Sequence, residues 1–87
     1  MNAHLVIYNV RDDKRRKALL DHIKTVDHKL LSESCYVVLT MQTRVQIFTS
    51  LAPHLLPEDD LVVSTFDRAT FGWHRAEVAD WIDLHMR

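Results

Sequence analysis

The sequence predicts one α+β domain with the element order strand, helix, strand, strand, helix, strand. Apolar, β-prone runs lie at both ends of residues 1–66, and an amphipathic stretch follows the first of them. A polar Ser-Glu-Ser segment also divides a long extended stretch into two strands. This order is that of the split βαβ, or ferredoxin-like, arrangement. We therefore expect a single domain over residues 1–87, with its core motif in 1–66 and a helical extension in 67–87.

The first strand and the first helix follow from a change of pattern near residue 11. The segment HLVIYNV at residues 4–10 is β-branched and aromatic, so we expect a central strand that is covered on at least one face. Asp12 or Asp13 then serves as N-cap, and the helix should continue to about Val26. Apolar residues at helical spacing form its core face: Leu19, Leu20, Ile23 and Val26.

The remaining elements follow from similar patterns. Residues 28–40 should form two strands that are joined by a bend at 32–34, although no glycine marks this hairpin. Residues 42–56 suit a helix that Thr43 caps and that Pro53 kinks or ends. The predicted apolar face of this helix is Val45, Phe48, Leu51, Ala52 and Leu55. The later segments are a turn at 57–60, a strand at 61–66 and a helix at 75–86.

The net charge of −1 offers no electrostatic argument for nucleic-acid binding by the chain as a whole. Charge is nevertheless uneven along the sequence. Residues 1–29 contain seven basic and four acidic residues, whereas residues 58–87 contain three basic and seven acidic residues. A basic face and an acidic face are one interpretation of this asymmetry, and ordinary solvated surface is the other.

Cysteine content and hydropathy indicate a cytoplasmic protein. The single cysteine, Cys35, has no internal disulfide partner and lies within a predicted strand, where we expect a packed thiol. We expect no signal peptide, because the first residues lack a basic segment and the apolar run is short. No segment approaches the roughly 20 apolar residues of a membrane span.

A four-stranded sheet with both helices on one face needs a cover for its other face. A second subunit is the expected cover, and this is the physical basis for predicting a homodimer. The alternative is a protein–protein module in which the acidic C-terminal helix, with Trp73 and Trp81, docks a different partner. Both tryptophans are equally compatible with the core of a small domain.

Two groups of charged residues are candidates for chemistry. Asp12 and Asp13 follow the first strand, and Asp59 and Asp60 precede the last, so a carboxylate pair could hold Mg²⁺. The simpler interpretation is a helix cap and a turn. The basic run 14–17 could contact phosphates or could be solvated surface. The six histidines lack the three or four convergent ligands that a zinc site needs, since His74 with Glu77 is a single pair.

Several stretches within residues 4–66 together resemble the CRISPR-associated protein 2 family. The first is Tyr8-Asn9-Val10, followed after one residue by Asp12-Asp13-Lys14-Arg15-Arg16 at the start of the helix. The stretch Ser34-Cys35-Tyr36 looks like the family's Ser-Val-Phe, and Glu58-Asp59-Asp60 looks like its acidic turn before the fourth strand. From Phe71 onward the sequence departs from the family pattern.

The resemblance implies a small ferredoxin-like homodimer of CRISPR adaptation. Several members are metal-dependent nucleases, in which two facing aspartates hold one divalent cation. Asn9 stands at that aspartate position and is a degenerate catalytic residue, because an amide keeps a carbonyl ligand but loses the charge that binds Mg²⁺. We therefore expect a nucleic-acid-associated or scaffolding protein with weak or absent nuclease activity. The expected phosphate contacts are Lys14, Arg15, Arg16 and Lys17.

The alternative within this resemblance is an active metal-dependent endonuclease, such as an endoribonuclease of toxin type. Asp12 and Asp13 would then replace the lost ligand, and Asn9 would orient a water molecule. Whether the nucleic acid is DNA or RNA stays open.

Overall fold

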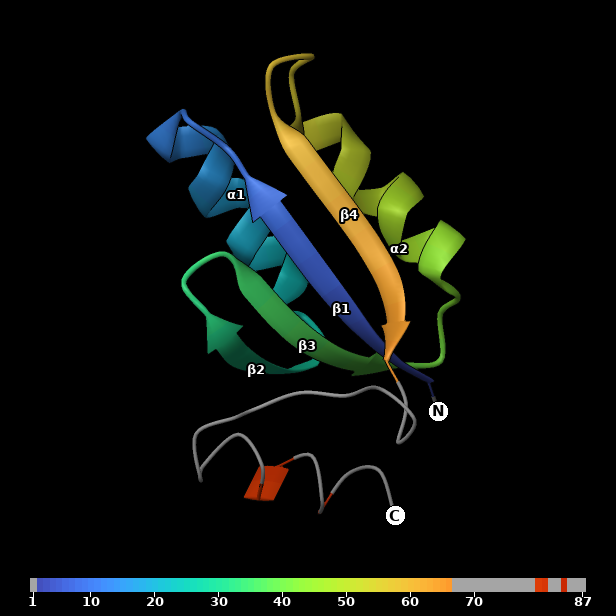
Figure 1. The fold of residues 1–87 in the computed structure, drawn as a ribbon. Helices are drawn as coiled ribbons and strands as arrows, with labels where there is room; N and C mark the ends of the chain where they lie inside the picture. Colours follow the sequence, from blue (N-terminus) through green and yellow to red (C-terminus); the bar gives the residue numbers. More distant parts are fainter. Residues whose placement is uncertain (1, 67–79, 82–83, 85–87) are drawn as a thin grey trace.

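A computed structural model of the chain describes residues 2–66, 80–81 and 84. Within them it contains a small α+β domain, with a four-stranded antiparallel sheet and two α-helices (Figure 1). The elements in chain order are β1 (Asn2–Asn9), α1 (Asp13–Ile23), β2 (Asp27–Ser32), β3 (Cys35–Thr40), α2 (Arg44–Leu51), the 3₁₀ helix η1 (Ala52–His54) and β4 (Asp60–Phe66).

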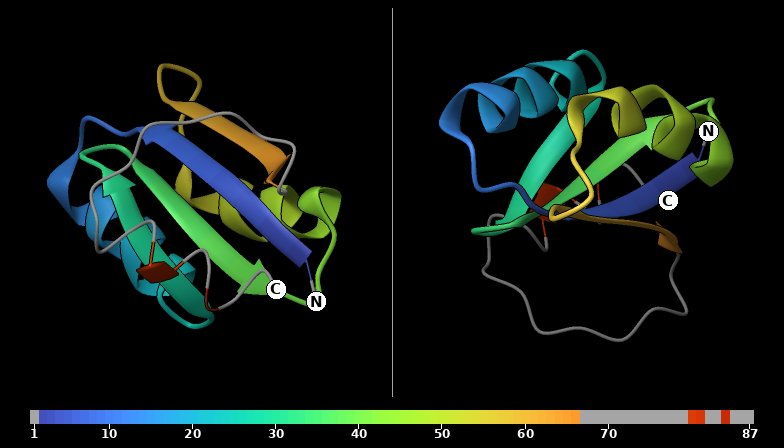
Figure 2. Two further views of the ribbon diagram at one scale, coloured as in Figure 1. Left: turned by 60° about the horizontal axis from the view of Figure 1, so that its bottom comes forward. Right: turned by 90° about the horizontal axis from the view of Figure 1, so that it is seen from above.

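The sheet has the strand order β2-β3-β1-β4, so the first strand lies in its interior. β1 pairs with β3 on one side and with β4 on the other, and both pairings are antiparallel. Both helices lie on the same side of the sheet, as the right-hand view of Figure 2 shows. At this level the structure is consistent with the expected ferredoxin-like arrangement.

Both helices are shorter than the sequence pattern predicts. α1 ends at Ile23 rather than near Val26, because the backbone N–H and the hydroxyl of Thr25 both donate to the carbonyl oxygen of His22, at 3.1 and 2.7 Å. α2 covers 44–51 rather than 42–56, since Pro53 stands inside the 3₁₀ turn that follows. Thr43 is its N-cap, as predicted.

The main core lies between the helices and the sheet. Val6 and Tyr8 of β1 meet Leu19 and Ile23 of α1, and the other buried members are Val10, Tyr36, Val38, Ile47 and Leu51. The prediction for α2 was partly wrong, because Val45 and Phe48 are exposed while Ile47 and Leu51 are buried. Ile47 and Leu51 are four positions apart and therefore lie on the same face of this short helix, which is the face that packs on the sheet.

The sheet face away from the helices is covered only in part by the described residues. Trp81 packs against a cluster of Ala3, Val37 and Leu39, and it belongs to a short helical piece that lies in front of β2 in the left view of Figure 2. Farther along this face, the cross-strand neighbours Ile7 and Val62 are 42% and 53% exposed. Among the described residues, Trp81 thus covers one part of this face, whereas Ile7 and Val62 in another part are partly exposed.

Other expectations have mixed outcomes. Cys35 is a buried free cysteine, and burial raises the pKa of its thiol, as expected for a packed side chain. Among the described residues, no helix is long and apolar enough to cross a membrane. Of the helix predicted at 75–86, the described residues Asp80, Trp81 and Leu84 are helical, and the rest lies outside the described residues, as do Trp73, His74 and Glu77.

Candidate functional site

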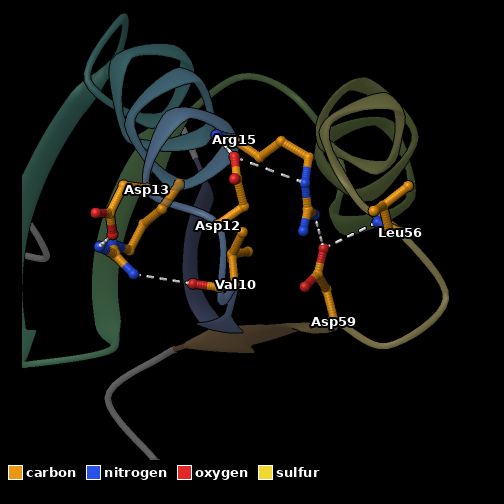
Figure 3. A network of polar contacts seen from close by, with 7 residues as sticks. Val10, Asp12, Asp13, Arg15, Leu56 and Asp59 are labelled. Atoms are coloured by element: carbon orange, nitrogen blue, oxygen red, sulfur yellow. Dashed lines mark hydrogen bonds and ion pairs between the residues drawn. The ribbon is translucent and has the colours of Figure 1, made fainter.

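The predicted site residues lie where β1 passes into α1. Figure 3 shows the polar contacts of this region, in which the start of α1 faces the turn before β4. We call this group the α1 N-terminal network; its members are Val10, Asp12, Asp13, Arg15, Arg16, Leu56 and Asp59.

Asp12 is the N-cap of α1. Its backbone is extended, with φ −80° and ψ 127°, and its Oδ2 accepts a hydrogen bond from the backbone N–H of Arg15 at 2.9 Å. This bond satisfies one of the N–H groups that a helix leaves unpaired at its start. The simpler interpretation of Asp12 from the sequence is therefore confirmed: one of its oxygens has a structural role.

Arg15 and Asp59 form an ion pair that joins the start of α1 to the turn before β4. Arg15 Nη1 donates to Asp59 Oδ2, and the same oxygen accepts the backbone N–H of Leu56 at 2.9 Å. The side chain of Asp59 has no exposed surface. The Leu56 N–H, followed by the Arg15 guanidinium, lowers the pKa of the Asp59 carboxyl group, while the hydrogen bond to Asp59 raises the pKa of Arg15.

Arg16 fastens the first turn of α1 to the end of β1. Its Nη2 donates to Asp13 Oδ1, and its Nη1 donates to the carbonyl oxygen of Val10 at 3.0 Å. Asp13 is almost fully exposed, so this ion pair contributes little to stability. The guanidinium of Arg16 is nevertheless oriented by the backbone of the strand.

Lys14 and Lys17 differ from the two arginines because they are exposed and lie outside this network. Lys17 Nζ pairs with Asp21 Oδ2 at 2.9 Å on the solvent side of α1. Within the part of the chain that the structure describes, Lys14 is the member of the basic run without an ion pair. Of the four predicted phosphate contacts, Lys14 is thus exposed and without an ion pair among the described residues, whereas Lys17 is exposed but paired with Asp21.

Asn9 is the last residue of β1, and its side chain lies on the sheet face away from the helices. Strand side chains alternate, so Asn9 shares the face of Ile7 and points away from α1. Its cross-strand neighbour is Asp60 of β4. The structure therefore places an acidic residue beside Asn9, but it is Asp60 rather than Asp12 or Asp13.

A polar hollow of about 490 Å³ opens at the same end of β1, lined by Tyr8, Asn9, Val10, Arg16, Leu20, Glu33 and Ser34. The Tyr8 hydroxyl donates to the carbonyl oxygen of Glu33 at 3.4 Å. Burial, and secondarily the neighbouring Tyr36, raises the pKa of Tyr8. Tyr8 is therefore a neutral hydrogen-bonding group at ordinary pH rather than a base.

The described residues contain no group of three or more His, Cys, Asp or Glu side chains that could hold a metal ion. Asp12 caps a helix, Asp13 pairs with Arg16, and Asp59 pairs with Arg15. Sequence reasoning foresaw that the end of the first strand and the start of the last lie side by side. It missed the Arg15–Asp59 pair, because opposite charges 44 positions apart give no local signal.

No family model matches this sequence, and no curated protein matches it.

Proposed function

We propose that the chain is a ferredoxin-like homodimer with a C-terminal helix that associates with nucleic acid in the cytoplasm and does not act as a metal-dependent nuclease. The observation that carries this proposal is that the acidic and the basic side chains at the start of α1 differ in their contacts. The carboxylates near Asn9 on the helix side have structural partners, whereas Lys14 and Lys17 face solvent.

The argument for phosphate contact rests on Lys14 and Lys17. Both are exposed near the start of α1, where the helix dipole also favours anions. Lysine ammonium groups bind phosphates as point charges and carry no sequence preference. Arg15 serves a different purpose in this proposal, since its pairing with Asp59 positions the helix.

The argument against hydrolysis rests on the ligand set. Mg²⁺ is bound mainly through carboxylates, and Asn9 supplies only a neutral oxygen. Asp60 lies beside it, so each protomer offers one carboxylate and one amide on this face. In this proposal the pair marks a metal site that lost the charge needed for tight binding.

The argument for a homodimer rests on Ile7 and Val62. This exposed apolar pair lies on the sheet face away from the helices and borders Asn9 and Asp60. A second copy that stacks on this face would bury both side chains. Trp81 covers a separate part of the face, so the proposed interface is the β1–β4 part.

The nucleic-acid proposal is tested with a charge-reversal double variant, Lys14→Glu with Lys17→Glu. The control is Lys24→Glu with Lys29→Glu, which changes the net charge equally at the other end of α1 and on β2. We expect duplex or single-strand binding to weaken at least about tenfold in the first variant only, with a shallower salt dependence. Equal losses in both variants would show that the contact is unspecific and would contradict the proposal.

The dimer and the degenerate metal site need separate variants. Ile7→Glu should convert the dimer to a monomer in light scattering, whereas Val45→Glu, an exposed apolar position on α2, should not. Asn9→Asp should introduce Mg²⁺-dependent cleavage that the natural chain lacks. Metal-dependent cleavage by the natural chain itself would refute this part of the proposal.

A further inference from the structure

Two histidines from distant parts of the chain form a hydrogen-bonded pair. His22 lies in the last turn of α1, and His54 ends η1, 32 positions later in the chain. His22 Nδ1 and His54 Nε2 are 3.3 Å apart, and the two rings are nearly perpendicular, with 86° between their planes. Neither histidine belongs to the α1 N-terminal network, so the pair is a separate link between α1 and η1.

The histidine pair is one of two links that hold the segment before β4 against α1. We call residues 52–59 the strap, which contains η1 and the turn that leads into β4. At the other end of the strap, Asp59 pairs with Arg15, as Figure 3 shows. Arg15 and His22 are seven positions apart, about two helical turns, and so lie on the same face of α1. The strap therefore follows this face from the last turn of α1 to its first turn.

The two links respond to different ranges of pH. A histidine side chain ordinarily takes up a proton at about pH 6.5, whereas arginine stays charged throughout. The Leu56 N–H, followed by the Arg15 guanidinium, lowers the pKa of the Asp59 carboxyl group, so the link between Arg15 and Asp59 persists as the pH falls to about 4. Mild acid therefore changes the link at His22 and His54 and leaves the other one intact.

Protonation of both rings breaks the hydrogen bond between them. In the neutral pair, one of the two facing nitrogens donates a hydrogen and the other accepts it. One added proton is tolerated, because the other ring keeps a lone pair. With both rings protonated, each facing nitrogen carries a hydrogen, and two like charges lie close together without an acceptor between them. The pair thus stabilises the attachment of η1 to α1 at neutral pH, and this contribution is lost as the pH falls and both rings become charged.

No anion compensates a second positive charge at this pair. Among the described residues, neither histidine forms an ion pair. The charged neighbours of His22 on α1, Asp21 and Lys24, are exposed, and Asp21 pairs with Lys17. On the strap, Glu58 is exposed near the end that Asp59 holds. From β3, α2 and the loop between them, the polar side chains that line a cavity of about 90 Å³ together with His22 are uncharged: Thr40, Gln42 and Ser50.

We propose that the pair of His22 and His54 is a pH-sensitive latch, which releases η1 from α1 when both imidazoles are protonated while Asp59 keeps the strap attached at its other end. The strap carries Leu55, which is partly buried against the main core, and the exposed Leu56. Release of η1 uncovers Leu55 beside Leu56, so the chain presents more apolar surface in mild acid than at neutral pH. The latch does not depend on the proposed nucleic-acid function, because it uses neither Asn9 nor the basic run 14–17.

The test is amide hydrogen exchange of the full chain by NMR at about pH 7.5 and about pH 5, corrected for the intrinsic exchange rate. Two amides report on the two ends of the strap. The Leu55 N–H donates to the carbonyl oxygen of Ala52 at 3.0 Å within η1, and the Leu56 N–H donates to Asp59 Oδ2 at 2.9 Å. We expect the protection of the Leu55 amide to fall about tenfold at the lower pH, and that of the Leu56 amide to fall much less.

Three variants assign the response to the pair. His54→Gln keeps a side chain that both donates and accepts but takes no charge, so the Leu55 amide should stay protected at both pH values. His54→Ala removes the link, so the same amide should exchange fast at both. His28→Gln is the control, because His28 Nδ1 contacts the backbone carbonyl oxygen of Val26 at 2.8 Å rather than another titratable group. This variant should keep the pH response of the natural chain.

The Tyr8 amide separates local release from unfolding of the domain. Its N–H donates to the carbonyl oxygen of Ser34 at 3.0 Å in the sheet, and it should stay protected at both pH values. An equal loss of protection at Tyr8 and Leu55 would mean unfolding of the whole domain and would overturn the proposal. Protection of Leu55 that does not depend on pH in the natural chain, or a pH response that persists in His54→Gln, would overturn it as well.

Discussion

The clearest test of the α1 N-terminal network is to replace Asp12 by alanine and by asparagine. The two replacements differ in one contact of Asp12, whose Oδ2 accepts the N–H of Arg15 at 2.9 Å. Alanine removes that acceptor, whereas asparagine keeps an acceptor of the same reach. Asparagine is also as good an N-cap as aspartate.

The expected magnitudes follow from these contacts. Loss of the cap in Asp12→Ala should lower the free energy of unfolding by about 1 kcal/mol. For a domain of this size, such a loss corresponds to a decrease in Tm of about 4–8 °C. Asp12→Asn should lose only the interaction between charge and helix dipole, about 0.3–1 kcal/mol at low salt. The exposed contact between Asp12 and Arg15 Nε at 3.9 Å adds little.

The assay is thermal or urea unfolding at low and at high salt. Salt screens the dipole interaction, so the asparagine variant should approach the natural chain at high salt while the alanine variant stays less stable. Asp13→Ala is the matched control, since Asp13 is nearly fully exposed and caps nothing. If asparagine and alanine destabilise equally at high salt, the hydrogen-bonded cap is not what Asp12 contributes.

Two further predictions concern the ion pair and the core. Because the folded state lowers the pKa of Asp59, its ionised form stabilises the fold above about pH 4, and this contribution disappears as the pH falls through the lowered value. Asp59→Asn should therefore lower the urea midpoint at pH 7, and this loss should shrink as the pH falls through the lowered pKa; a loss that does not change with pH would contradict the role of the charge. Leu19→Ala should cost about 2–5 kcal/mol, because Leu19 is fully buried, whereas Phe48→Ala on the exposed side of α2 should cost much less in the same denaturation series.

The order of elements could be predicted because each depends on local pattern. The apolar run before Asn9, the N-cap at Asp12 and the capping residue Thr43 are all read from neighbouring residues. The buried face of α2 could not be predicted in the same way. Val45 and Ile47 are both apolar, and only the position of the helix over the sheet decides that Ile47 is buried.

The candidate sites depend even more on tertiary contacts. The sequence could not show that Arg15 forms an ion pair while Lys14, in the same run of four basic residues, does not, because the partner of Arg15, Asp59, lies in a distant turn. Likewise, His4 of β1 and Thr65 of β4 become neighbours only through strand pairing. Neither residue carries a motif that would have singled it out.

The sequence by itself thus determined the order of the strands and helices within residues 2–66 and the residues that cap both helices. These are properties of residue types and of short-range spacing. Only the tertiary structure decided which charges are paired and which stay exposed, and which face of the sheet Trp81 covers. Those outcomes depend on contacts between segments far apart in the chain. The free energies of such contacts cannot be inferred from a local sequence pattern.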